Sequence, residues 1–415
     1  MARNLDQIVT NGLCIGCGLC ASIAGPDKVE MRWTPGGVMR PLELTPLDRA
    51  TMNLINATCP GVSTSGMTAE IAGPGAEHDD YWGYSHGMWD GWSGDPDIRH
   101  KAATGGALTS LAIHLLESGE VEFIAHMRSP GEAPIRNVPH VSVNREDVLA
   151  GMGSRYGPTA PLSNFMDHLE QGRPFALVAK PCDVSAVRNL AKRDDRVAEY
   201  CKYLLSISCG GQSTLQMTFN QMAKHDLAED DLTTFRYRGY GCPGETTMET
   251  KAGTTHTVTY LSIWEDKRNW HLPWRCKTCM DPIGEQADVI ALDIWPGGAP
   301  TGEDEGFNGI VARTAKGKGL VERAIAAGAL EVKPDQMPFV ETMADTQPHQ
   351  AWKKNGMLGR QWGLTLKGRL APRYPGLRVI RIALFKAGIV YTFRQMLGVM
   401  RRVRNGDADE PSVPI

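Results

Sequence analysis

The stretch FALVAKPCDVSAVRNL, residues 175–190, decides the fold of this chain. Its first residues are almost all apolar, as in a strand buried on both faces, and the residues from Asp183 onward follow a helical pattern. The apolar run YLLSIS at 203–208 predicts a further strand, and residues 212–225 predict a further helix. Strands that alternate with helices indicate an α/β fold with a mostly parallel sheet covered on both faces.

The same alternation starts at about residue 99, with helices predicted at 104–119, 144–152 and 161–172 and a strand at 121–127. After Leu232 the pattern changes to four predicted strands, at 235–241, 255–264, 287–295 and 309–315, with one helix at 319–328. We therefore expect five parts. They are a ferredoxin-like module at 1–62, a linker at 63–98, an α/β domain at 99–230, an α+β domain at 231–346 and a basic helical tail at 347–415.

Composition narrows the class of protein. The 415 residues carry a net charge of −3, but no Asp or Glu occurs from Thr346 to Gly406, so the tail is a separate basic unit. The start of the chain has no apolar signal-peptide core, and no apolar run is long enough for a membrane span. We expect a cytoplasmic protein, whose ten cysteines serve metals or catalysis more often than disulfides.

Three cysteines near the start follow the spacing C-x2-C-x2-C, in LCIGCGLC at 13–20. In bacterial ferredoxins this loop binds three corners of a [4Fe-4S] cluster, and a remote Cys-Pro supplies the fourth. ATCPGV at 57–62 contains such a pair. The predicted ligands are Cys14, Cys17, Cys20 and Cys59. A structural zinc site is the alternative, although zinc sites usually show paired C-x2-C halves.

A second set of cysteines follows from the expected sheet. Cys182 and Cys209 each follow a predicted strand, and ligands gather at the carboxyl edge of parallel strands. Cys276 and Cys279 add a C-x2-C pair. Together these four thiols would form a second [4Fe-4S] site. From the spacing alone, buried free cysteines at 182 and 209 and a zinc site at 276 and 279 remain equal alternatives. The two other cysteines, at 201 and 242, are expected to be structural.

Six stretches resemble, in the same order, the coenzyme F420 hydrogenase/dehydrogenase beta-subunit family, where F420 is a deazaflavin cofactor. The resemblance covers roughly residues 10–335. The stretches are TGGALTSL (104–111), GSRYGPT (153–159), AKPCDVSAVRNL (179–190), FRYRGYGCPG (235–244), RCKTCMDPIGEQADVIALDIW (275–295) and EGFNGIVART (305–314). The family includes F420-oxidising subunits, 7-hydroxymethyl chlorophyll a reductase and ferredoxin-dependent divinyl chlorophyllide reductase. The resemblance implies FAD and two [4Fe-4S] clusters, and it favours the second cluster site.

The chain departs from the family pattern at three places. Thr104 stands where relatives usually have Ser before two glycines, Cys242 where many have Trp, and Lys180 in a stretch that usually reads GTPCQ. With the resemblance, the residues expected around FAD are Thr104, Gly105, Gly106, Ser154, Arg155, Tyr156, Lys180, Arg236, Arg238 and Asn308. Arg155 could pair with the pyrophosphate, and Tyr156 could stack on a ring. No G-x-G-x-x-G motif indicates NAD.

The function expected from these features is electron transfer from a carrier through both clusters to FAD. Ferredoxin is the favoured carrier. FAD would then reduce a small organic substrate, with His100 as the candidate proton donor. The alternative is an electron-transfer subunit that exchanges hydride with coenzyme F420 for a larger complex. A non-catalytic zinc module on a nucleotide-binding domain is the third interpretation.

The basic tail has three interpretations. It could be a helix that covers the core, an amphipathic helix on an anionic membrane face, or a docking segment for an acidic partner such as ferredoxin. The cations around apolar residues are Arg378, Arg381, Lys386, Arg394, Arg401 and Arg402. No motif indicates nucleic-acid binding, and homo-oligomerisation stays open.

Overall fold

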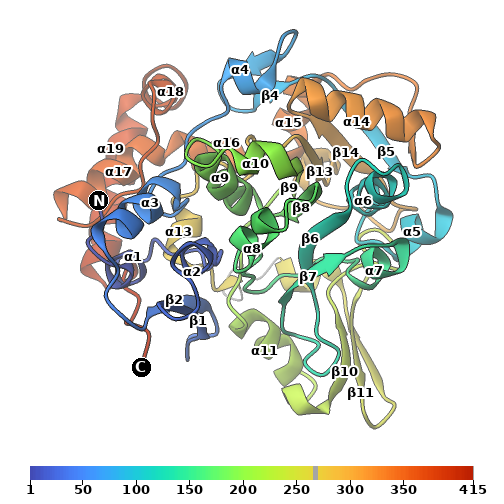
Figure 1. Ribbon diagram of the computed structural model, residues 1–415, viewed down its shortest axis with the longest axis horizontal. Helices are drawn as coiled ribbons and strands as arrows, with labels where there is room; N and C mark the ends of the chain where they lie inside the picture. Colours follow the sequence, from blue (N-terminus) through green and yellow to red (C-terminus); the bar gives the residue numbers. More distant parts are fainter. Residues whose placement is uncertain (265–269, 415) are drawn as a thin grey trace.

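The structure is a computed structural model that describes residues 1–264 and 270–414. An eight-stranded sheet forms the centre of the larger part of the molecule (Figure 1). Its strand order is β15-β5-β14-β13-β9-β8-β6-β7. The strands are β5 (Met88–Ser93), β6 (Phe123–Arg128), β7 (Val138–Ser142), β8 (Phe175–Ala179), β9 (Cys201–Ile207), β13 (Val289–Leu292), β14 (Asn308–Ala312) and β15 (Leu330–Val332).

The four central strands β6, β8, β9 and β13 run parallel to one another. In β8, the side chains of Phe175, Ala176 and Leu177 are completely buried, as the apolar run predicts. Helix α9 (Pro181–Leu190) begins just after this strand, where proline has the fixed φ of a first helical turn. The predicted α/β fold around a parallel sheet is confirmed.

Antiparallel strands extend the sheet on both sides. Strands β13, β14 and β15 come from residues 231–346, so this part shares one sheet with residues 99–230. Strand β5 comes from residues 63–98, where we expected only a linker. Its composition is that of a loop, but Met88 and Trp89 are buried against the sheet, and this burial outweighs the local propensity.

Helices cover both faces of the sheet (Figure 1). One face is covered by α6 (Ala107–Glu117), α7 (Arg145–Ala150) and α14 (Ala315–Ala326). The other is covered by α8 (Phe165–Glu170), α9, α10 (Arg196–Tyr200) and α15 (Phe339–Thr346). The smaller elements α4 (Ala69–Ala72), β3 (Glu77–Asp79) and β4 (Gly83–Ser85) connect the N-terminal module to β5, and α5 (Pro96–Lys101) follows β5 and leads to α6.

A separate three-stranded antiparallel sheet projects from the main body (Figure 1). It consists of β10 (Leu232–Arg236), β11 (Thr246–Thr250) and β12 (Thr255–Val258), and α11 (Gln216–Ala223) packs beside it. The strand predicted over 255–264 is wrong in its second half, because α12 (Tyr260–Trp264) is a helix. The ring of Trp264 meets that of Tyr156 edge-on at 4.7 Å, and such aromatic packing fixes this turn.

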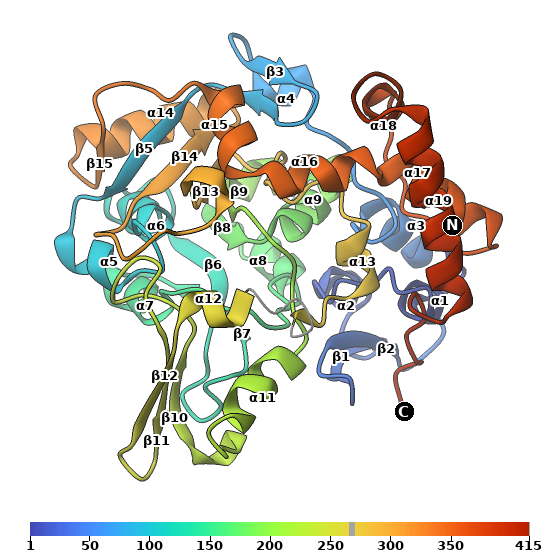
Figure 2. The same cartoon turned by 180° about the vertical axis from the view of Figure 1, so that it is seen from behind.

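The N-terminal module has its own apolar core. It contains α1 (Leu5–Thr10), α2 (Leu19–Ala24), β1 (Val29–Trp33), β2 (Met39–Glu43) and α3 (Arg49–Thr58). The end of the chain returns to it, since Val413 joins this core and buried Arg40 pairs with Glu410 at 2.6 Å. The two ends of the chain therefore lie on the same side of the molecule (Figure 2).

The tail is helical, as predicted, and forms an outer layer beside the N-terminal module (Figure 2). It contains α16 (Pro348–Asn355), α17 (Met357–Leu366), α18 (Arg378–Arg381), η4 (Ile382–Ala387) and α19 (Ile389–Arg404). Helices α17 and α19 approach closely at Gly359. A Cβ there would lie 2.1 Å from the Thr392 carbonyl oxygen, so only glycine fits. Across the described residues, we find no helix with the length and apolarity needed to span a bilayer.

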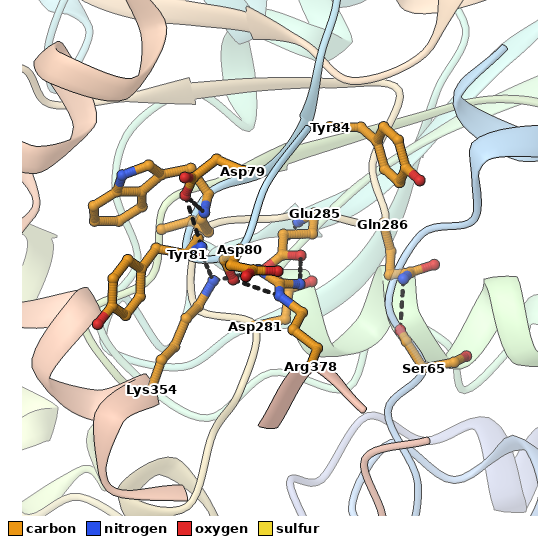
Figure 3. Close-up of polar contacts among 12 residues, drawn as sticks. Ser65, Asp79, Asp80, Tyr81, Tyr84, Asp281, Glu285, Gln286, Lys354 and Arg378 are labelled. Carbon is orange, nitrogen blue, oxygen red and sulfur yellow. Dashed lines mark hydrogen bonds and ion pairs between the residues drawn. The ribbon is translucent and has the colours of Figure 1, made fainter. Parts of the chain in front are cut away.

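A buried charge cluster fastens the tail to the core (Figure 3). Glu285 forms ion pairs with Lys354 of α16 and Arg378 of α18, and only 3% of its side chain is exposed. Burial alone would raise the pKa of Glu285, but the two cations outweigh it and lower this pKa to about 2. Next to the cluster, Arg381 pairs with Asp80, which adds a contact at the surface.

We predict that Glu285→Gln destabilises the protein by about 3 kcal/mol, because it leaves two cations without their carboxylate. The lowered pKa of Glu285 implies stability that is present above its ordinary value of 4.5 and is lost as the pH falls toward about 2. The variant should lose this acid dependence. Denaturant unfolding at several pH values measures both effects.

Glu322→Gln is the matched control. Glu322 pairs with Lys318 on an exposed helical face, with 54% of its side chain accessible, so its loss should cost less than about 1 kcal/mol. Equal costs for the two variants would show that the buried cluster does not fasten the tail.

Candidate functional site

Four cysteines of the N-terminal module line one small cavity. Two come from the loop before α2, one from the first turn of α2 and one from the C-terminal cap of α3; they are Cys14, Cys17, Cys20 and Cys59. The loop turns around the cavity at Gly16 and Gly18, whose φ angles of 76° and 87° suit only glycine without strain. The structure therefore brings together the four residues predicted as the first ligand set.

The thiols of this first cavity are free. Burial raises the pKa of Cys14 to about 11 and raises the pKa values of Cys17 and Cys20 well above the ordinary value. Such thiols lose their protons only when a metal supplies positive charge. In residues 1–264 and 270–414, no three His, Cys, Asp or Glu side chains are grouped so that they could hold a metal ion. The four cysteines nevertheless line one cavity, so they are the side chains of this module that could hold a cluster with four cysteine ligands.

The second set of four cysteines also lines one cavity. Cys182 lies in the first turn of α9, Cys209 follows β9, and Cys276 and Cys279 come from α13 (Trp274–Lys277) and the loop after it. The backbone N–H of Cys209 donates to the Pro282 carbonyl at 2.7 Å, which ties the strand end to this loop. The carboxyl edge of the sheet thus assembles the second predicted donor set.

Two residues lie between the cysteine cavities. Ile15 lines both. The guanidinium of Arg275 is buried, and it donates to the carbonyls of Pro60 at 2.7 Å and Gly61 at 3.2 Å beside the first set, and to the Thr278 carbonyl at 2.8 Å beside the second. Among the described residues it has no carboxylate partner. A buried cation of this kind suits a site that binds a negatively charged group.

A pocket of about 300 Å³ lies at the carboxyl ends of the parallel strands. This is the edge at which open α/β sheets bind ligands. Eight of the ten residues predicted around FAD line the pocket: Thr104, Gly106, Ser154, Arg155, Tyr156, Lys180, Arg238 and Asn308. Residues at the ends of β6, β8, β9 and β13 also line the pocket.

The turn at Thr104, Gly105 and Gly106 is held by Asn308. The side-chain amide of Asn308 donates to the Thr104 hydroxyl at 2.7 Å, and its oxygen accepts the N–H of Ala107 at 3.2 Å. Gly105 does not line the pocket, but a Cβ there would lie 2.9 Å from both Asn308 Oδ1 and the Phe307 Cα atom. Glycine at 105 is therefore required for this close packing, which shapes the wall of the pocket.

Three predicted residues do not have the contacts or the position expected of them. Arg155 lines the pocket, but its guanidinium donates to Asn137 Oδ1 at 2.8 Å and to three backbone carbonyls, which occupy the donors expected for a pyrophosphate. Arg236 donates to Gly239 and Thr247 away from the pocket. His100 is exposed on α5 and does not line the pocket.

The pocket and the second cysteine cavity share a wall. Lys180, Cys209, Gly211 and Gln212 line both. The Lys180 ammonium pairs with the buried Asp183 carboxylate at 2.7 Å. Burial would lower the pKa of Lys180, but Asp183 and Cys182 outweigh it and raise this pKa. The Lys180–Asp183 pair therefore stands between the two spaces.

Sequence reasoning missed two acidic residues of the pocket, Asp293 and Asp183. Arg238, which was predicted, is paired with Asp293 at 3.0 Å, and its guanidinium lies 5.0 Å from the ring centroids of both Tyr260 and Trp295. Asp293 comes directly after β13, so its position after a buried strand could have indicated it. Asp183 also faces the pocket, with one buried carboxylate oxygen that lacks a partner among the described residues.

The chain matches two models of one family. Residues 88–167 match the N-terminal part of the coenzyme F420 hydrogenase/dehydrogenase beta subunit, and residues 172–337 match its C-terminal part. Together these ranges cover more than half of the chain. The chain belongs to this family. The first cysteine set and the basic tail lie outside the matched ranges.

Three archaeal relatives indicate the redox character of the family. The chain is 25% identical over 260 residues to an F420-dependent formate dehydrogenase beta subunit of Methanococcus maripaludis, a match that covers 61% of this chain and 63% of the relative. It is 24% identical to a coenzyme F420 hydrogenase beta subunit of Methanococcus voltae, covering 58% and 81%. It is 23% identical to a coenzyme F420-dependent sulfite reductase of Methanocaldococcus jannaschii, covering 76% and 46%. The chain thus spans less than two thirds of the formate dehydrogenase subunit, and the relatives support a redox role.

A solved structure supports the fold. A chain of the F420-reducing [NiFe] hydrogenase complex of Methanosarcina barkeri matches with a TM-score of 0.50 and 20% identity. The match covers 67% of this chain and 95% of that chain. At this identity the likeness establishes the α/β architecture alone.

We predict that Gly105→Ala lowers the stability of the protein by about 1–3 kcal/mol, because the added methyl group would meet the backbone of Phe307 and Gly91 and the Asn308 side chain that holds the turn. The midpoint of thermal unfolding measures this loss. Gly302→Ala is the control, since no atom lies within 4 Å of a Cβ at this exposed position. A Gly105→Ala protein as stable as the control would contradict the packing described for the turn.

Proposed function

We propose that this chain is an electron-transfer oxidoreductase subunit that exchanges a hydride equivalent with a coenzyme F420-type deazaflavin and exchanges single electrons with a partner protein. One observation carries the proposal. Three cavities follow one another through shared walls, with Ile15 between the two cysteine cavities and Lys180 and Cys209 between the second cavity and the pocket. Such a series suits the stepwise passage of electrons through protein-bound groups.

In this proposal, the eight cysteines bind two [4Fe-4S] clusters. Cys14, Cys17, Cys20 and Cys59 would hold the first, and Cys182, Cys209, Cys276 and Cys279 the second. Four thiolates give each cluster a net negative charge, and the buried guanidinium of Arg275 lies beside both cysteine sets. Neutralisation of this charge by Arg275 and Lys180 would favour the reduced state, since local charge and hydrogen bonding set cluster potentials.

The pocket at the strand ends would hold FAD. A flavin exchanges two electrons with an organic molecule and one electron at a time with an iron-sulfur cluster. Thr104, Gly106 and Ala107 supply a turn with small side chains, which lets a ligand approach the backbone closely. The Arg238–Asp293 ion pair adds a polar wall to this pocket.

The choice of coenzyme F420 over ferredoxin rests on the relatives, whose names connect them to F420. The sequence alone favoured ferredoxin as donor and reduction of a small organic substrate. No contact in the described residues favours this route, and His100, its candidate proton donor, lies outside the pocket.

We predict about eight iron atoms per chain in anaerobically prepared protein, as two cubes require. Cys17→Ser should reduce the iron content to about four, and Cys279→Ser should do the same, because each removes one ligand of a different cluster. Iron analysis with visible absorption measures both. Cys201→Ala is the control, since this buried cysteine lines neither cavity and should leave the iron content unchanged.

A second prediction tests the electron donor. Purified chain loaded with FAD and iron should show bleaching of the flavin absorption when reduced coenzyme F420 is added without oxygen. Photoreduced ferredoxin should bleach it at least about tenfold more slowly. Faster reduction by ferredoxin would reject the F420 assignment, and failure of FAD to bind would reject the flavin site.

A further inference from the structure

The tail carries most of the large apolar side chains that are exposed in the described part of the chain. Outside it, such side chains are scattered singly, for example at Leu44 and Val143. Within it, Phe385 is 80% exposed and Leu377 is 70% exposed. The apolar tail residues are Trp352, Trp362, Leu366, Leu377, Ile380, Leu384, Phe385, Ile389, Val390, Phe393 and Leu397. Monomeric proteins rarely expose apolar side chains so densely without a function for them.

Part of this set forms one apolar face across α17 and α19. In α19, Ile389, Val390, Phe393 and Leu397 are spaced so that they share one side of the helix. The ring of Trp362 on α17 lies 6.2 Å from the ring of Phe393, which joins the faces of the two helices. The segment from α18 to the start of α19 adds Phe385 at its exposed turn.

Cations surround this apolar face. Residues 346–406 contain thirteen Lys and Arg and no Asp or Glu. Lys354 and Arg378 form ion pairs with buried Glu285. At the surface, Arg381 pairs with Asp80 and Arg369 pairs with Asp409. Others are exposed and make no ion pair within residues 1–264 and 270–414; they are Arg373, Lys386, Arg394, Arg401, Arg402 and Arg404.

We propose that this tail face binds the surface of an anionic lipid bilayer. An amphipathic helix with Phe, Trp and Leu on one face and arginines around it is the pattern of a helix that lies in the membrane interface. Anionic lipids attract each nearby Lys or Arg, and the apolar side chains enter the headgroup region. The pattern fits lipid better than a protein partner, because the most exposed tail side chain, Phe385, is adjacent to exposed Lys386, and lysine is depleted in protein interfaces.

This surface would orient the redox site. The Tyr374 hydroxyl donates to the Thr278 carbonyl, and Arg360 of α17 donates to the Lys277 carbonyl at 2.6 Å. Both acceptors belong to the loop that carries Cys276 and Cys279. A membrane-bound tail would therefore hold the second cysteine cavity at a fixed distance from the bilayer, while the pocket stays accessible from solution. The membrane proposal itself does not depend on which groups fill these cavities.

Vesicle flotation tests the proposal with the full-length, iron-loaded protein. We expect it to float with vesicles that contain phosphatidylglycerol, at least about tenfold more than with pure phosphatidylcholine, and to be released by high salt. Phe385→Ser combined with Val390→Ser should lower binding about tenfold or more, through lost apolar burial. Arg394→Gln and Arg401→Gln should each lower binding to anionic vesicles about fivefold.

The controls separate membrane binding from other uses of this face. Val143→Ser removes an exposed apolar side chain elsewhere, with 53% exposure, and should bind vesicles like the unmodified chain. Iron content and circular dichroism verify that every variant is folded. Three results would overturn the proposal: no flotation with either vesicle, flotation that Phe385→Ser with Val390→Ser does not weaken, or a dimer in solution that these substitutions convert to monomer.

Discussion

The parallel pairing of β8 with β9 is the constraint on which the site depends. Ala179 pairs with Ser206, and the Ser206 hydroxyl donates to the Ala179 carbonyl at 2.7 Å, so both strands reach the edge of the sheet together. Cys182 and Cys209 follow at that edge and are neighbours through the fold alone. Because the backbone hydrogen bond from Cys209 to Pro282 brings in the loop of Cys276 and Cys279, one sheet register positions four thiols and one wall of the adjoining pocket.

Buried cations are the second feature that connects the parts of the molecule. Arg275 joins the loop of Cys59 to the loop of Cys276 through carbonyl oxygens, and Lys180 stands between the second cavity and the pocket. Lys180 is paired with Asp183, but Arg275 has no carboxylate partner among the described residues, and an isolated buried cation is costly. A negatively charged metal cluster would offset that cost. In the Glu285 cluster, a buried carboxylate offsets the charge of two cations, Lys354 and Arg378. These ion pairs join the tail to the core.

The sequence predicted the parallel core and the first cysteine set because these depend on short-range patterns. The second set was left open by its spacing and was favoured only by the family resemblance; the structure brings its four thiols to one cavity. Strand β5 was missed because its Gly and Trp residues are typical of a loop, and only its pairing with β14 and β15 makes it a strand. The helix at α12 was missed for a similar reason, since tertiary aromatic contacts fix it. The prediction that Arg155 pairs with a pyrophosphate did not include the carbonyls of Pro134 and Arg136. The fold brings these carbonyls to the Arg155 guanidinium. Nothing local in the sequence marks Arg275 as the residue between the cavities.

We propose that the two cysteine cavities bind two iron-sulfur cubes in series with the pocket. Anomalous diffraction at the iron edge, on crystals grown without oxygen, locates the iron in the molecule. We expect two separate iron peaks, one bounded by Cys14, Cys17, Cys20 and Cys59 and the other by Cys182, Cys209, Cys276 and Cys279. A single iron peak would contradict the series, and peaks that appear only at the zinc edge would contradict the redox function as a whole.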